Sequence, residues 1–147
     1  MKNKILIFIP VYNCEKQLER VLINIYENSL FFFDEILIVD NISKDDTLNK
    51  AIYNSHLFSN IKYTVIQNAV NVNLGGSHKT AIRYAKENNY DKIIVLHGDD
   101  QADLKDIFHL IKNNKHLQFD CLLGSRFMKN SKKENYSKIR TIGNLFF

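Results

Sequence analysis

Apolar runs of strand length alternate along this sequence with stretches whose apolar residues recur at helical spacing. The runs are rich in isoleucine, leucine and valine, which favours strands buried in a sheet. We expect strands at residues 4–10, 35–39, 61–67, 93–96 and 119–123. Helices are predicted at residues 15–28, about 43–56, 79–88 and 104–112, and a Gly-containing loop at residues 71–77.

This alternation with short connections predicts an α/β fold, in which helices cover both faces of a mostly parallel sheet and the crossovers are right-handed. The run at 93–96 is wholly apolar, so we expect that strand to be buried on both faces. The run at 61–67 is less apolar and is expected nearer an edge. Pro10 closes the first run and predicts the end of that strand, because proline cannot donate to a central ladder.

Segments that contain polar residues stand at or near the ends of four of the five predicted strands. They are Pro10-Val11-Tyr12-Asn13, Asp40-Asn41, Asp99-Asp100-Gln101 and Gly124-Ser125-Arg126. The carboxyl ends of parallel strands share one edge of the sheet, so residues scattered in sequence can converge there. This edge is the predicted functional site.

Asp99, Asp100 and Gln101 carry carboxylate and carboxamide oxygens, the ligands that Mg²⁺ or Mn²⁺ takes together with substrate phosphates. The alternative is that the acids stabilise the start of the helix at 104–112. That alternative suits Asp103, because Asp106 stands three residues on. Asp99 lies too far upstream to cap the helix, so metal binding is the preferred interpretation there.

Asp40 also has two interpretations. A carboxylate after the second strand can accept hydrogen bonds from a base or ribose, as it does in nucleotide-binding folds. It can instead assist the helix that follows, although Ser43 is the better candidate for that position.

Length and composition narrow the class of protein. The chain has 147 residues, 45% of them hydrophobic, and one proline, as expected for one folded domain rather than a disordered segment. Its two cysteines, Cys14 and Cys121, lie far apart, which favours a reducing, cytoplasmic setting. No stretch approaches the roughly 18 apolar residues of a membrane span, so we expect a soluble or at most peripheral protein.

The net charge of +4 is unevenly distributed. Residues 1–125 hold 14 Lys and Arg against 15 Asp and Glu, whereas residues 126–147 hold six basic residues against Glu134 alone. The basic segment is either a solvated surface or a region that attracts phosphates or anionic lipid. Nucleic acid is not an expected partner, because no recognised nucleic-acid fold pattern accompanies the charge.

Several enzyme classes lack their motifs. Gly75-Gly76-Ser77-His78-Lys79-Thr80 has neither the glycine spacing of a P-loop nor the glycine before its lysine. No Gly-x-Gly-x-x-Gly follows the first strand, which argues against an NAD enzyme. A His-Glu-x-x-His pair and a Gly-x-Ser-x-Gly elbow are also absent, so a zinc protease or serine hydrolase has no support.

The residues resemble a family 2 glycosyltransferase of the GT-A fold over nearly the whole chain. The resemblance is carried by Pro10 to Asn13, Ile38 to Thr47, Asn73-Leu74-Gly75-Gly76 and the acidic strand end. Gly98-Asp99-Asp100-Gln101 followed by Gly124-Ser125-Arg126 is most similar to the subgroup that transfers sugars to polyprenyl phosphates. The Asp-x-Asp-x-Gln triplet of that subgroup falls here on His97, Asp99 and Gln101, so histidine replaces the first aspartate.

The resemblance implies a role for each matched residue. Asp99, Gln101 and His97 would be metal ligands, and Asp99, Asp100 and Arg126 would be catalytic. The donor would be held by Pro10, Tyr12, Asn13, Asp40, Asn41, Gly75, His97, Gly98 and Ser125. Asn41 stands where the family commonly has a second aspartate.

The implied reaction is an inverting transfer of a sugar from a nucleotide-sugar, with Mg²⁺ or Mn²⁺ neutralising the departing diphosphate. A polyprenyl phosphate acceptor needs no strong general base, whereas a sugar hydroxyl does, and we find no persuasive candidate for a base. Alternatives are transfer to a glycan hydroxyl in cell-surface polysaccharide synthesis and nucleotide-sugar binding without turnover. Family members usually continue past this length, so we expect a single catalytic domain over residues 1–147, truncated at its C-terminus, with residues 126–147 on the acceptor side.

Overall fold

The computed structural model describes residues 3–28 and 32–125. These fall into two compact units that divide between Asn113 and Asn114. The first unit contains a four-stranded parallel sheet of order β3-β2-β1-β4. Its strands are β1 (Ile5–Val11), β2 (Glu35–Asp40), β3 (Lys62–Gln67) and β4 (Lys92–Val95). As predicted, β3 is an edge strand.

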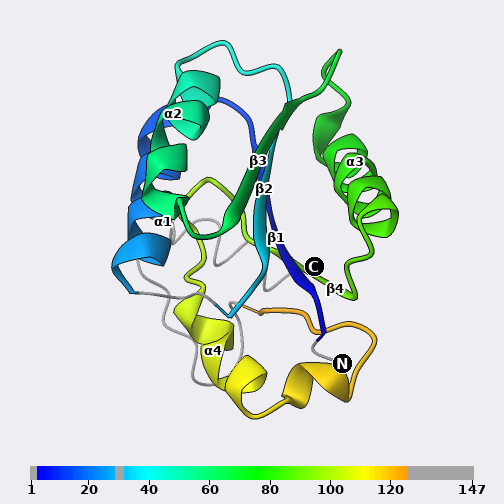
Figure 1. Cartoon of the computed structure of the whole chain (residues 1–147). Coiled ribbons are helices and arrows are strands. Elements are labelled where there is room, and N and C mark those ends of the chain that lie inside the picture. The colour runs from blue at the N-terminus through cyan, green and yellow to red at the C-terminus, as the bar shows by residue number, and fades with distance from the viewer. Residues whose placement is uncertain (1–2, 29–31, 126–147) are drawn as a thin grey trace, which may run out of the picture. The chain divides into compact units, whose positions relative to one another are not determined.

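Helices cover both faces of this sheet (Figure 1). On one face lie α1 (Glu15–Glu27) and α2 (Thr47–Tyr53), and on the other lies α3 (Asn73–Glu87). The remaining helices are the short 3₁₀ helix η1 (Asn54–Phe58), α4 (Lys105–Lys112) and, in the second unit, η2 (Lys115–Leu117).

The side-chain alternation of the strands divides the core into two layers. Ile5, Ile7 and Ile9 of β1 join the cluster under α1, together with its buried residues Leu18, Val21, Leu22 and Ile25. Leu6 and Phe8 point the other way, into a cluster with Ala81 and Ala85 of α3. The small alanine side chains let α3 lie close to the sheet.

Pro10 does not end β1. The strand continues to Val11, and Pro10 pairs with Val39 of β2. Proline lacks only the N–H, and its carbonyl still accepts a hydrogen bond from the Gly98 N–H at 3.2 Å. The predicted strand end was therefore one residue too early.

Three other predictions are wrong. β4 is only partly buried, with Val95 42% exposed, because β1 is its sole strand neighbour in the described part of the chain. Residues 119–123 form no strand: they find no ladder partner among the described residues, and Leu123 is 86% exposed. Residues 73–77, expected in a loop, are the first turns of α3, where the Asn71 Oδ1 accepts the Asn73 N–H at 3.0 Å.

The second helix also starts later than its sequence suggested. It begins at Thr47, and Asp45 is the residue that hydrogen-bonds to this helix start. The Asp45 Oδ1 accepts both the N–H and the Oγ1–H of Thr47. Burial alone would raise the pKa of Asp45, but these bonds outweigh burial and lower it. Ser43 instead donates its hydroxyl to Asp40.

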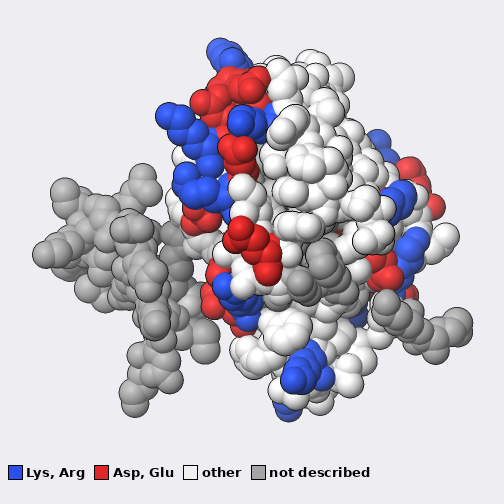
Figure 2. Space-filling model, turned by 60° about the vertical axis from the view of Figure 1, so that its left-hand side comes forward, with Lys and Arg blue, Asp and Glu red and all other residues white. Residues whose placement is uncertain are grey.

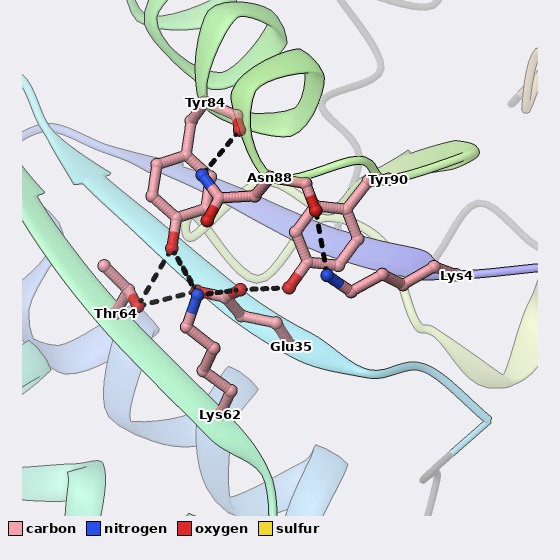
Figure 3. Close-up of polar contacts among 7 residues, drawn as sticks. All are labelled: Lys4, Glu35, Lys62, Thr64, Tyr84, Asn88 and Tyr90. Atoms are coloured by element: carbon pink, nitrogen blue, oxygen red, sulfur yellow. Dashed lines mark hydrogen bonds and ion pairs between the residues drawn. The ribbon is translucent and has the colours of Figure 1, made fainter.

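Glu35, the first residue of β2, is a carboxylate with no exposed surface. Figure 3 shows its four partners: Thr64 and Tyr84 donate to Oε1 at 2.6 and 2.7 Å, Tyr90 donates to Oε2, and the Lys62 ammonium lies 3.0 Å from Oε2. These contacts join β2, β3, the last turn of α3 and the α3–β4 connection at the amino end of the sheet.

Candidate functional site

The carboxyl ends of the strands lie in register. Val11 pairs with Asp40, and Asp40 pairs with Gln67. Beyond the end of β4, the chain continues alongside β1, because the Leu96 N–H donates to the Phe8 carbonyl at 3.0 Å and the Gly98 N–H to the Pro10 carbonyl. This pairing carries the segment that follows β4 to the end of β1.

Gly98 makes the close approach possible. A Cβ at this position would lie 2.6 Å from Cγ1 of Val11 and 3.4 Å from both the Cys14 Sγ and the Pro10 carbonyl oxygen. Any larger residue would push the segment away from β1. The glycine therefore fixes how close His97 and Asp99 come to the β1 end.

A cavity of about 270 Å³ opens at this edge. Six of the predicted site residues line it: Pro10, Tyr12, Asn41, His97, Gly98 and Asp99. Six further residues complete the lining, namely Val11, Cys14, Asn71, Asn73, Leu74 and Ser77. The convergence inferred from the strand ends is thus present for β1, β2 and the segment after β4.

The other predicted residues of the first unit do not line this cavity. Asn13 is in the left-handed region, with φ 50°, and links two loops: its Oδ1 accepts the Lys44 N–H at 2.7 Å, and its N–H donates to the Ser43 Oγ. Gly75 lies on α3, and Asp100 and Gln101 follow Asp99 outside the lining.

Ser125 lies in the second unit and Arg126 lies outside the described residues, so neither can be placed relative to the cavity.

Asp40 is fully buried at the end of β2. Its Oδ2 accepts hydrogen bonds from the Ser43 N–H at 3.2 Å and the Gln67 Nε2 at 2.9 Å, and its Oδ1 accepts from the Ser43 hydroxyl. The carboxylate thus ties the β2 end to β3 and to the following loop. Its contact with a base or ribose stays a prediction.

Asn41 organises the loop that leads into α3. Its Oδ1 accepts from the Val72 N–H at 2.9 Å and from the Asn68 Nδ2 at 3.1 Å, and its Nδ2 donates to the Asn71 Oδ1 at 2.8 Å. Asn68 also donates to the Ser77 Oγ. The sequence contains no motif that would predict this network of amide side chains. Asn71 and Ser77 were therefore not among the predicted site residues.

The first turns of α3 face the cavity through Asn73, Leu74 and Ser77. The unpaired N–H groups at a helix start carry partial positive charge and suit an anion such as a phosphate. The Asn71 Oδ1 uses one of these N–H groups, that of Asn73. The cavity wall therefore combines a helix start with the Asp99 carboxylate.

Comparison with known proteins identifies the chain's family. The family model described as glycosyl transferase family 2 matches residues 6–147. The chain belongs to glycosyl transferase family 2. The match confirms the family that the sequence predicted, and the parallel sheet flanked by helices agrees with the predicted GT-A fold.

Two relatives of this family 2 chain are archaeal. It is 28% identical to a UDP-N-acetylglucosamine–dolichyl-phosphate N-acetylglucosaminyltransferase of Methanococcus voltae, with 99% of the chain and 61% of that protein covered. It is 32% identical to a dolichol-phosphate mannosyltransferase of Pyrococcus furiosus, with 95% and 38% covered. The chain thus spans less than two thirds of either relative.

Solved structures share the fold. The mannosyltransferase PcManGT from Pyrobaculum calidifontis, in complex with GDP-Man and Mn²⁺, superimposes with a TM-score of 0.55 at 20% identity, covering 67% of this chain and 28% of that one. Residues 1–349 of S. aureus TarS in complex with UDP-GlcNAc give 0.57 at 21% identity, covering 76% and 32%.

The donor set of this family 2 cavity suits a metal that takes few protein ligands. Within residues 3–28 and 32–125, no three His, Cys, Asp or Glu side chains are grouped to hold an ion by themselves. Asp99 and His97 both line the cavity, however, and Mg²⁺ and Mn²⁺ sites commonly use one or two protein ligands with substrate phosphates. The Asp99 Oδ1 also accepts the Gln101 N–H at 3.2 Å.

Cys14 lines the cavity as a thiol rather than a thiolate. Burial raises its pKa, although hydrogen bonds at Tyr12 and Thr47 act in the opposite direction. A protonated thiol is a weak nucleophile, so the cavity offers no sulfur nucleophile at neutral pH.

In the described parts of the chain, no helix has both the length and the apolar character needed to cross a bilayer.

Proposed function

We propose that this chain is the nucleotide-sugar-binding part of an inverting glycosyltransferase that uses a divalent metal and a polyprenyl phosphate acceptor. The observation that carries the proposal is the cavity at the carboxyl edge of the sheet, whose lining includes Asp99, His97 and residues of the first turns of α3. Family membership supports the reaction class, and the archaeal relatives named for dolichyl-phosphate substrates support the acceptor.

Residues in and near the cavity are then assigned chemical tasks. Asp99 would hold the metal, with His97 as a further ligand and Gln101 as a neighbour able to complete the set. When bound, the metal supplies Lewis-acid stabilisation of the departing diphosphate. The start of α3 binds and orients the phosphates by its N–H groups. Arg126 is proposed to add a fixed cation at the diphosphate.

The nucleoside would lie toward the β1 end. Tyr12 is 47% exposed and lines the cavity beside Pro10 and Asn41, so its ring is available for stacking. Asp40 is proposed to act at this end of the site, and Asn13 and Gly75 are proposed to support the donor from the surrounding loops.

A phosphate acceptor fits the residues of the cavity better than a sugar hydroxyl. The phosphate oxygen is already anionic, so the displacement requires no general base. Burial raises the pKa of Cys14, and Asp99 and His97 are assigned to the metal, so none of the three is offered as a base.

A second candidate is nucleotide-sugar binding without turnover. The specific observation in its favour is His97, which stands where family relatives of this subgroup carry the first acid of the triplet. Imidazole is a poorer ligand for Mg²⁺ than a carboxylate. Release of nucleoside diphosphate from GDP-mannose or UDP-N-acetylglucosamine, measured with a phosphorylated polyprenol, separates the two candidates.

Asp99→Asn tests the metal site. We expect the native chain to bind GDP or UDP more tightly with Mn²⁺ than without, and the variant to lose this metal-dependent gain while keeping its melting temperature, because the amide removes the charge but not the volume. Isothermal titration with and without Mn²⁺ measures the gain. Asp103→Asn is the matched control, since the Asp103 carboxylate accepts the Lys105 N–H and lies outside the cavity.

Equal metal-dependent gains in the native chain and Asp99→Asn would refute the assignment of Asp99. Absence of binding to any nucleoside diphosphate by the native chain would refute the proposed donor site itself.

A further inference from the structure

Asp100 follows the proposed metal ligand but does not line the cavity. Its backbone is in the left-handed region, with φ 62°, where Cβ crowds the following carbonyl and which aspartate adopts more readily than most side-chain-bearing residues. Its carboxylate points toward α1 and accepts a hydrogen bond from the Arg20 Nε at 2.7 Å. The two residues are 80 positions apart in sequence.

Arg20 is itself held in place. Its Nη1 donates to the Lys16 carbonyl at 3.2 Å, one turn back along α1. The opposite face of this helix is fixed in the core by Leu18 and Leu22, both fully buried. The guanidinium therefore connects the turn at Asp100 to an element that cannot shift without disturbing the core.

The turn at Asp100 determines the direction in which Asp99 projects. The Asp99 Oδ1 accepts the N–H of Gln101, the residue after the left-handed position, so the three residues form one local unit. If Asp100 relaxed to an ordinary right-handed or extended conformation, this bond would be lost and the backbone on either side would reorient. Aspartate tolerates this conformation better than most L-residues, and the hydrogen bond from Arg20 adds to its stability.

We propose that Arg20 is a positioning residue, which holds the Asp100 turn and thereby keeps Asp99 directed into the cavity for metal-dependent binding of a nucleoside diphosphate. The metal-binding part of this inference rests on the proposed function. Loss of Arg20 lowers the fraction of molecules in which the turn is formed. The apparent affinity falls in proportion, because only those molecules bind with the intrinsic affinity.

The expected effect is moderate because both partners are partly exposed, at 59% and 37% of their side-chain surface. Exposed ion pairs stabilise weakly and are screened by salt. We expect Arg20→Ala to weaken Mn²⁺-dependent binding of GDP or UDP about threefold to fivefold at low salt, with a smaller effect at high salt. The affinity measured without Mn²⁺ should stay unchanged, and the melting temperature should fall by no more than a few degrees.

The matched control is Lys50→Ala. Lys50 forms a partly exposed ion pair with Glu19 of α1, the helix of Arg20, at 3.2 Å. In the described part of the chain, neither residue hydrogen-bonds to Asp100. Removing this cation changes the charge of the same region without touching Asp100. Its Mn²⁺-dependent affinity should match that of the native chain.

A double-mutant cycle with Asp100→Gly distinguishes positioning from direct contact with the ligand. Glycine adopts φ near +60° without support, so Arg20→Ala should have less than about a twofold effect in the Asp100→Gly background, whatever the glycine itself costs. If the full threefold to fivefold loss persisted in that background, Arg20 would be binding the ligand directly and the inference would be overturned.

Amide hydrogen exchange without ligand tests the same inference independently of the donor site. Exchange at residues 97–103 should be faster in Arg20→Ala than in the native chain or Lys50→Ala, and unchanged exchange there would overturn the inference. Failure of the native chain to bind nucleoside diphosphates would count against the proposed function alone, because the exchange measurement still decides whether Arg20 holds the turn.

Discussion

Glu35 is the residue in the described structure whose burial most needs an explanation. A carboxylate without exposed surface is unfavourable unless donors replace its hydration. Burial alone would raise the pKa of Glu35, but hydrogen bonds from Thr64, Tyr90, Tyr84 and Lys62 outweigh it and hold the pKa below its usual value. Burial and the bond to Glu35 raise the pKa of Tyr90, so that phenol stays a donor (Figure 3).

Glu35→Gln should lower the free energy of unfolding by about 1–3 kcal/mol at pH 7, because the new amide nitrogen would face two donors. A depressed pKa means that the native stabilisation is complete above the unfolded value of about 4.3 and is lost as the pH falls through the folded value. The loss of stability between pH 5 and 3 should therefore be smaller in the variant. Urea denaturation at several pH values measures both effects.

Glu87→Gln is the control for that experiment, since Glu87 is exposed on α3. It should keep both the stability at pH 7 and the steep decline in acid. An identical acid decline in native protein and Glu35→Gln would contradict the role given to the buried carboxylate.

Asn41 shows why an amide rather than an acid stands at the second strand end. Its Oδ1 faces the Val72 N–H, and the Asn71 Oδ1 faces the Asn73 N–H, so these backbone donors fix the orientation of both amides. The Asn71 Oδ1 then needs a donor from Asn41, which only an amide nitrogen provides. A carboxylate at position 41 would place two oxygens against each other.

Asn41→Asp should accordingly destabilise the protein by about 1–3 kcal/mol and weaken nucleotide binding through the loop before α3. Asn49→Asp is the matched control: Asn49 also donates its amide, to Asp46 at 2.7 Å, but on the exposed surface. Thermal denaturation compares the two variants. Equal losses of stability would show that the buried network stabilises the protein no more than the exposed Asn49 hydrogen bond does.

At the scale of elements, the start of α3 depends on one of two adjacent glycines. A Cβ on Gly75 would meet nothing within 4 Å, whereas a Cβ on Gly76 would lie 2.3 Å from the Val72 Cβ. Gly76 thus permits the chain to turn tightly from Val72 into the helix. Gly75 only carries the conformational cost of glycine in a helix.

The two alanine variants should therefore change the free energy of unfolding in opposite directions. Gly75→Ala should raise the free energy of unfolding by about 0.5–1 kcal/mol, and Gly76→Ala should lower it by about 1–3 kcal/mol because Val72 must move. Urea denaturation of both variants measures the difference. Nucleotide titration of Gly75→Ala then tests the predicted contact of Gly75 with the donor, and two changes of the same sign in stability would contradict the packing argument.

The elements that could be predicted from sequence are those whose signal is local. The runs before Pro10 and Asp40 became β1 and β2 because continuous β-branched and aliphatic residues suit a strand covered on both faces. The run at 93–96 has the same composition, but composition does not say how many strand neighbours a run will have. The start of α3 was missed because a side-chain bond from Asn71, rather than a sequence period, sets it.

The site was predictable only as far as topology determines it. Parallel strands bring Pro10, Asn41 and Asp99 to one edge whatever their loops do, and all three line the cavity. Contacts between distant loops and helices have no signal in a single sequence. The pairing of Arg20 with Asp100 is of this kind.

At the scale of the whole molecule, charge is divided between the described fold and the segment beyond it. Figure 2 shows Lys and Arg interleaved with Asp and Glu on the face turned forward, and the described ion pairs Arg20–Asp100 and Lys50–Glu19 belong to α1 and its neighbours. Residues 1–125 carry a net charge of −1, and residues 126–147 carry +5. Long-range attraction to an anionic surface would thus come from the terminal segment.

Neutralising five basic residues of that segment tests whether it serves such a surface. The residues are Lys129, Lys132, Lys133, Lys138 and Arg140, each changed to Gln. Basic residues near an anionic bilayer contribute roughly 1 kcal/mol each, and the attraction fades with salt. The five changes should abolish sedimentation with phosphatidylserine vesicles at low salt and spare GDP or UDP binding, whereas Arg126→Ala should weaken nucleotide binding and spare sedimentation.

The control for net charge neutralises five exposed lysines of the described fold instead. Changing Lys44, Lys79, Lys86, Lys105 and Lys112 to Gln removes the same charge from the whole molecule but leaves the segment basic. If attraction depends on where the charge lies, this variant should still sediment with anionic vesicles and fail to do so with neutral phosphatidylcholine vesicles. A native chain that does not sediment with anionic vesicles even at low salt would rule out the membrane role, because the segment would then be a solvated surface.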